Sequence, residues 1–273
     1  MKIASKKTCI IGCGNMGLIY AQLLRDCIGE NEKNIVLIAK DEVSKNNLSQ
    51  KKLGFVDLIS SQEITESDIL LLAVKPQDFF FVSQKLIGRI KSDALVISVM
   101  AGINLHAIQK SLNHSSIIRA MPNAPAQYAK GVTVFCNSSD LSVEHAKLGE
   151  YFLGLAGKII KTENEGLLDS VTAISGSGPA YFFYLALELK NAATDLGMDY
   201  EIAEILVRQT LIGSAEMVAN KNDSLSDLIK TISSKGGTTE AALNHFNGKE
   251  LNLIIVEAIQ KATERSLQLS ANE

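Results

Sequence analysis

The chain has 273 residues, of which 46% are hydrophobic and 21% are charged, and its formal net charge at pH 7 is −3. This composition is typical of a globular protein and excludes the disordered and fibrous classes. The 27 basic residues are spread along the chain, so we expect no binding to nucleic acid or to an acidic membrane surface. Small molecules are the expected ligands.

Membrane helices, export signals and metal sites are not expected. No apolar run approaches the roughly 18 residues that a membrane helix needs, so we expect a soluble protein. The start of the chain carries no export signal and the four cysteines show no CxxC spacing, which together favour a cytoplasmic protein. The four histidines are scattered and lack the spacing of metal ligands, so no metal site is predicted.

The first predicted strand, residues 8–11, runs into a GxGxxG loop that opens a helical pattern. This order is typical of dinucleotide binding. The first glycine makes the tight turn, the second lets backbone approach a pyrophosphate, and the third lets the helix pack on the strand. A tight turn without a ligand is the alternative. The residues predicted to bind the dinucleotide are Gly12, Gly14, Asn15, Met16 and Gly17.

The end of the second predicted strand, residues 35–39, bears on the choice of cofactor. An acidic side chain there would accept a hydrogen bond from the free ribose hydroxyl of NAD, whereas a cation suits the phosphate of NADP. Lys40 and Lys45 therefore favour NADPH, while Asp41 leaves NADH possible. A solvated surface turn is the alternative for both lysines.

Three more apolar segments, residues 69–74, 95–99 and 117–120, are predicted strands. Ligands of open α/β sheets lie at the carboxyl ends of the strands. A proline-rich elbow follows the last of the three strands, and its stiff backbone suits a place beside a cofactor. The cofactor contacts predicted from these strand ends are Ala73, Val74, Lys75, Pro76, Ala101, Gly102 and, in the elbow, Asn123.

The predicted secondary structure changes from alternating strands and helices to helices alone in the second half of the chain. Residues 131–136 and 157–161 are the last predicted strands, and residues 144–155 form a helix between them. Helical periodicity then dominates, with long helices predicted at residues 181–196, 202–218 and 251–269. We predict an α/β Rossmann-type domain with a mostly parallel sheet over residues 1–162, followed by an all-α domain over residues 163–273.

A small polar loop interrupts the helical half. It contains Ser234, two glycines and two threonines just before a helical segment. Paired glycines let backbone amides approach a ligand, and the amides and dipole at a helix start favour an anion. The alternative is an ordinary turn with a helix N-cap, and the stretch taken alone favours that alternative.

Together these motifs resemble the pyrroline-5-carboxylate reductase family, and the resemblance spans nearly the whole chain. It implies that NAD(P)H reduces the cyclic imine of 1-pyrroline-5-carboxylate to L-proline. It also implies a Rossmann domain followed by a helical dimerisation domain, with active sites at the interface of a homodimer or higher oligomer. The motifs are Gly12-Cys-Gly-Asn-Met-Gly17, Ala73-Val-Lys-Pro-Gln77, Ser98-Val-Met-Ala-Gly102, Arg119-Ala-Met-Pro-Asn-Ala-Pro-Ala126, Ser175-Gly-Ser-Gly-Pro-Ala-Tyr181 and Gly236-Gly-Thr-Thr239.

The resemblance assigns roles in the polar loop. It implies that the Thr239 hydroxyl hydrogen-bonds the imine nitrogen as the catalytic group. It also implies that amides around Ser234, Gly237, Thr238 and Thr239 hold the substrate carboxylate. Lys235 stands where the family usually has proline. The loss of proline loosens the loop, and the lysine places a cation near an anionic substrate. We expect the cation to attract the substrate carboxylate and so to offset part of the lost rigidity. The alternative is a solvent-facing lysine without a functional role.

Two other functions were weighed. The related β-hydroxyacid dehydrogenases carry a catalytic lysine early on the interdomain helix. The first lysine of that helix here is Lys190, which is too far along the helix to meet the nicotinamide. A non-catalytic dinucleotide sensor is the other alternative, and the intact Gly236-Gly-Thr-Thr239 motif argues against it.

Overall fold

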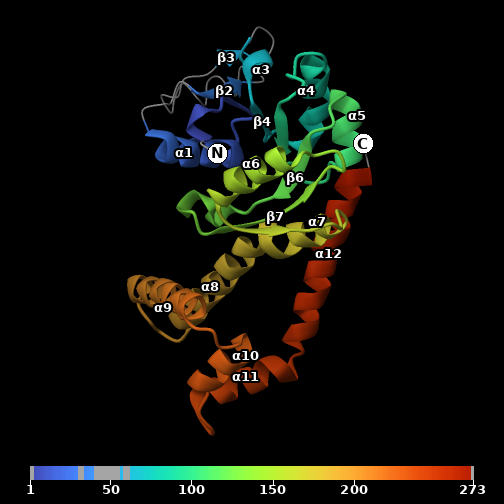
Figure 1. Cartoon of the computed structure of the whole chain (residues 1–273). Coiled ribbons are helices and arrows are strands. Elements are labelled where there is room, and N and C mark those ends of the chain that lie inside the picture. The colour runs from blue at the N-terminus through green and yellow to red at the C-terminus, as the bar shows by residue number, and fades with distance from the viewer. Residues whose placement is uncertain (1–2, 30–33, 40–55, 58–61, 272–273) are drawn as a thin grey trace. The chain divides into compact units, whose positions relative to one another are not determined.

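The computed structural model describes residues 3–29, 34–39, 56–57 and 62–271 (Figure 1). The chain forms two compact units. Unit 1 comprises residues 1–177 and 262–273, and unit 2 comprises residues 178–261. The predicted division after residue 162 follows the last described strand, and as a domain boundary it stays a prediction.

An open sheet forms the centre of unit 1. Within the described residues it has eight strands in the order β3-β2-β1-β4-β5-β6-β7-β8. Neighbouring strands are parallel except β6 and β7, which confirms the mostly parallel α/β sheet. The predicted strands end within two residues of the observed ones, and only the two-residue β3 was not predicted. The strands are β1 (Thr8–Ile11), β2 (Ile35–Ala39), β3 (Val56–Asp57), β4 (Ile69–Leu72), β5 (Leu95–Ser98), β6 (Ile117–Met121), β7 (Gly131–Asn137) and β8 (Gly157–Lys161).

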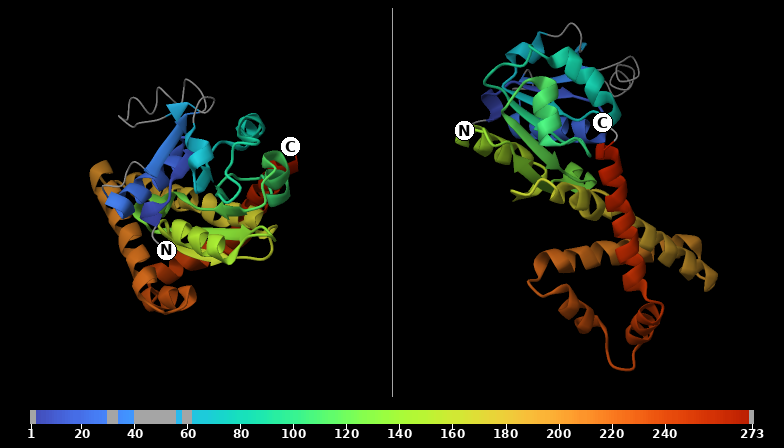
Figure 2. Two further views of the ribbon diagram at one scale, coloured as in Figure 1. Left: turned by 45° about the horizontal axis from the view of Figure 1, so that its top comes forward. Right: turned by 90° about the vertical axis from the view of Figure 1, so that its right-hand side faces the viewer.

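Helices cover both faces of this sheet, as Figures 1 and 2 show. On one face α1 and α6 pack on the strands, and the rings of Tyr20 and Phe152 stack with centroids 5.1 Å apart. On the other face α3, α4 and α5 supply the apolar layer. Because both faces are covered, β1, β4 and β5 are buried along their whole length. The helices of unit 1 are α1 (Asn15–Ile28), α3 (Glu63–Glu66), α4 (Phe79–Leu86), α5 (Leu105–Leu112), α6 (Val143–Gly154) and α7 (Leu167–Val171), with 3₁₀ turns at Ile3–Ser5, Pro76–Asp78 and Ala124–Tyr128 and a π-helical turn at Thr172–Gly176.

Strand register brings the carboxyl ends of the central strands to one edge. Ile11 pairs with Leu72, and Leu72 pairs with Ser98. The chain runs outward from β1 to β3 in one direction and from β4 to β8 in the other. The order therefore reverses between β1 and β4, which is where open α/β sheets bind their ligands.

Unit 2 is helical throughout its described structure, which confirms the all-α prediction. Its helices are α8 (Gly178–Asp195), α9 (Tyr200–Asn220), α10 (Leu225–Ile232), α11 (Thr238–Gly248) and the first part of α12 (Leu251–Ala271). Helices α8 and α9 pack against each other. The side chains of Asp199 and Ser224 accept hydrogen bonds from the first turns of α9 and α10, which explains where these helices begin.

The end of α12 belongs to unit 1. There the Ser266 hydroxyl donates to a carboxylate oxygen of Asp169 over 2.7 Å, and both residues are buried. Among the described residues, none of the helices combines the length and apolar character needed to cross a membrane.

A partly buried ion pair joins Arg119, in the middle of β6, to Glu165, whose carboxylate also contacts the start of α5. The Arg119 side chain is only 5% exposed, and its guanidinium donates to Glu165 over 2.8 Å. The same oxygen of Glu165 accepts the Leu105 N–H over 2.7 Å at the first residue of α5. One carboxylate thus satisfies a buried cation and an otherwise unpaired helix-end donor.

We expect Glu165→Ala to lower the free energy of unfolding by about 3 kcal/mol, because it leaves the Arg119 charge buried without a partner. Urea denaturation measures the loss. Glu163→Ala is the matched control: the Glu163 side chain is 86% exposed in its pair with Lys161, so we expect a change below about 0.5 kcal/mol. Equal effects of the two substitutions would contradict the role of Glu165.

Candidate active site

The loop between β1 and α1 has the backbone geometry of a dinucleotide site. Gly12 has φ +105°, and a Cβ there would lie 2.4 Å from the carbonyl oxygen of Ala73. A Cβ at Gly17 would lie 1.9 Å from the carbonyl oxygen of Gly12. Around Gly14, by contrast, a Cβ would meet no described atom within 4 Å. The first and third glycines are therefore required by packing, and the second leaves open space for a ligand.

Among the described residues, none accepts a hydrogen bond from the first amides of α1. Gly14 is the N-cap, and it has no side chain to bond the amides of the first turn. Gly14 and Asn15 are exposed and Met16 is half-buried. Free amides and a positive helix end suit the negative charge of a pyrophosphate. These residues fit the dinucleotide that the sequence predicts.

The ends of β4 and β5 lie next to this loop. The Ala73 N–H donates to the Ile11 carbonyl over 2.8 Å, which places Ala73 and the buried Val74 beside β1. Lys75 is exposed and immediately precedes the turn that begins at Pro76.

Three predicted cofactor contacts follow β5 and β6, namely Ala101, Gly102 and Asn123. Gly102 is buried with φ +80°, a conformation that favours glycine, and Ala101 is half-buried. Asn123 accepts the Val132 N–H on its side-chain oxygen over 2.9 Å, so it ties the proline-rich elbow to β7. The predicted contact Lys40 lies outside the described residues.

The polar loop of unit 2 joins α10 to α11. Gly236 has φ +73°, and the Gly237 N–H donates to the Ser234 carbonyl over 3.0 Å. A Cβ at Gly237 would lie 2.6 Å from the Ser234 hydroxyl oxygen. Both glycines are therefore explained by local geometry, one by its positive φ and the other by close contact.

Two amides at the start of α11 remain available. Gly237 is the N-cap and contributes no side-chain acceptor. Among the described residues, none accepts a hydrogen bond from the N–H of Thr238 or Thr239. Thr238 is exposed and Thr239 half-buried. The predicted anion-binding amides are thus present, and the Gly237 N–H is the one already engaged within the loop.

Sequence reasoning missed one residue of this loop, Glu240. Its carboxylate accepts the Gly236 N–H over 2.7 Å. An acidic residue at the third position of a helix is a recognised sign of an acceptor that reaches back over the helix start, and that spacing was available in the sequence.

No other reactive group stands out among the described residues. They contain no cluster of His, Cys, Asp and Glu that could hold a metal ion. Burial raises the pKa of the Cys9 thiol to about 11 and that of the Cys136 thiol to about 12. Both thiols therefore stay protonated near neutral pH and are poor nucleophiles.

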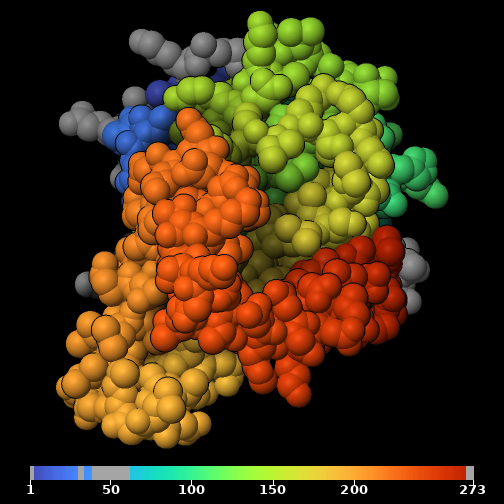
Figure 3. Space-filling model, turned by 90° about the horizontal axis from the view of Figure 1, so that it is seen from below, coloured from blue at the N-terminus to red at the C-terminus, as the bar shows by residue number. Residues whose placement is uncertain are grey.

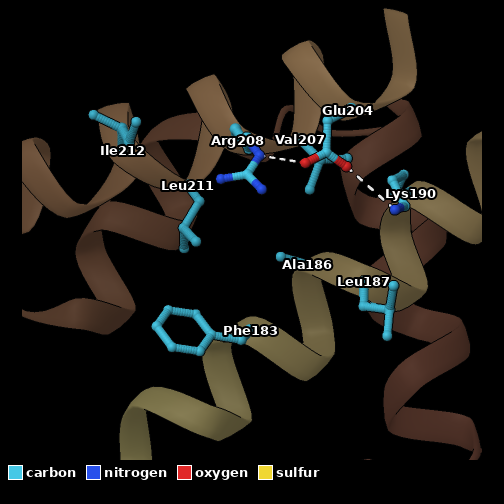
Figure 4. A pocket seen from close by; sticks show the side chains of 9 residues that line it. All are labelled: Phe183, Ala186, Leu187, Lys190, Glu204, Val207, Arg208, Leu211 and Ile212. Carbon is cyan, nitrogen blue, oxygen red and sulfur yellow. Dashed lines mark hydrogen bonds and ion pairs between the residues drawn. The ribbon is translucent and has the colours of Figure 1, made fainter. Parts of the chain in front are cut away.

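Lys190, the first lysine of α8, is held within unit 2 (Figure 4). Its ammonium donates to the Tyr200 hydroxyl over 3.1 Å and pairs with Glu204 over 3.2 Å. Arg208 binds the other oxygen of Glu204. Its hydrogen bonds to Tyr200 and Glu204 raise the pKa of Lys190, so it is poorly suited to releasing a proton.

Comparisons with known proteins cover both halves of the chain. The family described as pyrroline-5-carboxylate reductase dimerisation matches residues 165–269, and the family described as coenzyme F420-dependent NADP oxidoreductase matches residues 7–102. A pyrroline-5-carboxylate reductase of Pasteurella multocida is 35% identical over 271 residues, which cover 97% of this chain and 98% of that protein.

Solved structures agree in fold over nearly the full length. A pyrroline-5-carboxylate reductase of Coxiella burnetii has a TM-score of 0.83 and 29% identity, with 97% of this chain and 99% of that chain covered. The pyrroline carboxylate reductase of Plasmodium falciparum, solved with NADP bound, has a TM-score of 0.83 and 26% identity, with 98% and 99% covered.

The glycines of the first loop allow a test that separates packing from ligand binding. We expect Gly17→Ala to destabilise the protein by about 3 kcal/mol, since the new methyl group overlaps backbone. Gly14→Ala is expected to cost less than about 1 kcal/mol but to weaken NADPH binding about tenfold. Thermal denaturation and NADPH titration measure the two effects. Wild-type NADPH affinity in Gly14→Ala would contradict a close approach of cofactor at Gly14.

Proposed function

The chain belongs to the pyrroline-5-carboxylate reductase family, and we propose that it reduces the imine of 1-pyrroline-5-carboxylate to L-proline, the last step of proline biosynthesis. The observation that carries this proposal is the loop at the start of α11, where the Thr238 and Thr239 amides have no acceptor among the described residues and lie next to a threonine hydroxyl. Amides at a helix start suit the substrate carboxylate, and a hydroxyl beside them suits the imine nitrogen.

Catalysis by this loop rests on positioning and on hydrogen bonding. When bound, the reduced nicotinamide supplies the hydride that reduces the imine carbon. Thr239 donates a hydrogen bond to the imine nitrogen, which makes that carbon more electrophilic. The Thr238 and Thr239 amides hold the carboxylate, and Ser234 lines the loop with Gly237. No covalent nucleophile is required, because orientation and electrostatic stabilisation lower the barrier.

The dinucleotide lies along the strand ends of unit 1 in this proposal. Gly12, Gly14 and Gly17 shape its pyrophosphate site, with Asn15 and Met16 at the helix start. The remaining proposed contacts are Lys40, Ala73, Val74, Lys75, Pro76, Ala101, Gly102 and Asn123. NADPH is the preferred cofactor and NADH a possible one, because Lys40 and Lys45 suit a ribose phosphate.

A second copy of the chain is the proposed partner, and a match to a family of dimerisation domains supports self-association. Unit 2 exposes large apolar side chains on α8 and α9, including Phe182, Phe183, Ile202 and Ile205, each more than half exposed. Figure 3 shows helices of unit 2, in gold and orange, at the molecular surface. Monomeric proteins rarely expose apolar patches of this kind. A homodimer or higher oligomer covers them, with the active sites at its interface, and the cytoplasm remains the predicted location.

The experiment that tests the activity mixes protein, pyrroline-5-carboxylate and either NADPH or NADH, and follows the absorbance of the reduced nicotinamide. We expect Thr239→Ala to lower kcat/KM about 100-fold, because it removes a positioned hydrogen-bond donor. Thr239→Ser, which keeps the hydroxyl, should recover most of the loss. An unchanged kcat/KM in Thr239→Ala would remove this role, and no oxidation of either cofactor by the wild type would favour the sensor alternative.

Lys235 allows a test of electrostatic attraction. It is exposed next to the left-handed Gly236, so its ammonium is placed to attract an anionic substrate. We expect Lys235→Pro to raise KM for pyrroline-5-carboxylate a few-fold at low salt and to have less effect at high salt, where charges are screened. Steady-state kinetics at two salt concentrations measure this. A change in KM that does not depend on salt would leave Lys235 without an electrostatic role.

A further inference from the structure

The carboxylate of Glu240 lies at the base of the polar loop that connects α10 to α11. It is the third residue of α11, and one of its oxygens accepts the Gly236 N–H over 2.7 Å. Glu240 is half-buried, whereas the neighbouring Ser234, Lys235 and Gly236 are exposed. The carboxylate is therefore turned back over the start of its own helix.

This contact determines which amides of the loop remain free. Four consecutive N–H groups, those of residues 236–239, belong to the turn and the first residues of α11. The Glu240 carboxylate accepts a hydrogen bond from the Gly236 N–H, and the Ser234 carbonyl accepts one from the Gly237 N–H. Of these four, only the Thr238 and Thr239 N–H groups are left without an acceptor among the described residues. The Thr238 and Thr239 amides therefore form an adjacent pair open to an anion, next to the Glu240 N–H, which also has no acceptor among the described residues.

The same contact holds the left-handed part of the backbone. Gly236 is in the left-handed region with φ +73°, and the rotation of its peptide sets the direction in which the following amides point. A hydrogen bond from its N–H to a charged acceptor is stronger than one to a neutral acceptor. With that bond present, the loop is already arranged before substrate arrives, which lowers the ordering cost of binding.

We propose that Glu240 is a positioning residue that occupies the Gly236 N–H. The substrate carboxylate then binds the Thr238 and Thr239 amides, and the imine nitrogen accepts a hydrogen bond from the Thr239 hydroxyl. This inference rests on the proposed function. Glu240 itself does not touch the substrate, and its negative charge is partly offset by its hydrogen bond and by the positive end of α11. In its absence the Gly236 N–H competes for the carboxylate and shifts the substrate away from the threonine.

Two substitutions separate the acceptor from the charge. Glu240→Ala removes the acceptor, and we expect kcat/KM to fall about tenfold with a larger effect on kcat than on KM, because a misplaced substrate still binds but reacts slowly. Glu240→Gln keeps an oxygen in the same place, and we expect kcat/KM within about threefold of the wild type. Glu201→Ala is the matched control, since Glu201 lies in the first turn of α9, away from the loop.

Hydrogen exchange of the Gly236 amide provides a readout that does not depend on activity. We expect faster exchange in Glu240→Ala and wild-type exchange in Glu240→Gln and Glu201→Ala. Faster exchange with unchanged kcat/KM would overturn the proposal and leave Glu240 as a helix cap only. Equal losses of kcat/KM in Glu240→Ala and Glu240→Gln would overturn the acceptor role. A wild-type protein that does not reduce pyrroline-5-carboxylate would refute the proposed function instead, whatever the exchange rates.

Discussion

Close backbone contact at the end of β1 is the constraint on which the cofactor half of this protein depends. Gly12 lies against Ala73, and Gly17 lies against the carbonyl of Gly12, with no room for a side chain at either glycine. This contact brings β1, β4 and α1 together at the point where the strand order reverses. The open space at Gly14 exists because its neighbours are held so closely.

Carboxylates that hold backbone amides recur in both units. In unit 1, Glu165 accepts the first amide of α5 while it neutralises the buried Arg119. In unit 2, Glu240 accepts the Gly236 amide at the start of α11. Each contact fixes a turn next to a segment to which we assign ligand contacts, and neither carboxylate is needed as an acid or base. Both carboxylates thus stabilise the backbone conformation. This agrees with a reaction that requires orientation of the substrate more than a nucleophile.

Much of the fold could be predicted from sequence because its signals are local. Continuous apolar runs predicted the buried strands, and 3.6-residue periodicity predicted the long helices of unit 2. The two-residue β3 was missed because so short a segment has no periodicity of its own. Among the site residues, every glycine except Gly14 has a positive φ or a close contact that admits no other residue, which made these positions recognisable. Glu240 was missed, although its spacing from the helix start was visible.

The sequence by itself determined the order along the chain of every described strand except β3 and of the three longest C-terminal helices. It also determined the positions of the required glycines and the family to which the chain belongs, because all of these depend on residue type and short-range spacing. Only the tertiary structure decided which polar groups are paired. It joined Arg119 to Glu165, 46 residues away, and engaged Lys190 with Tyr200 and Glu204. In the polar loop it left the Thr238 and Thr239 amides without an acceptor among the described residues. Hydrogen bonding depends on distance and direction in the folded chain, and no periodicity in the sequence encodes either.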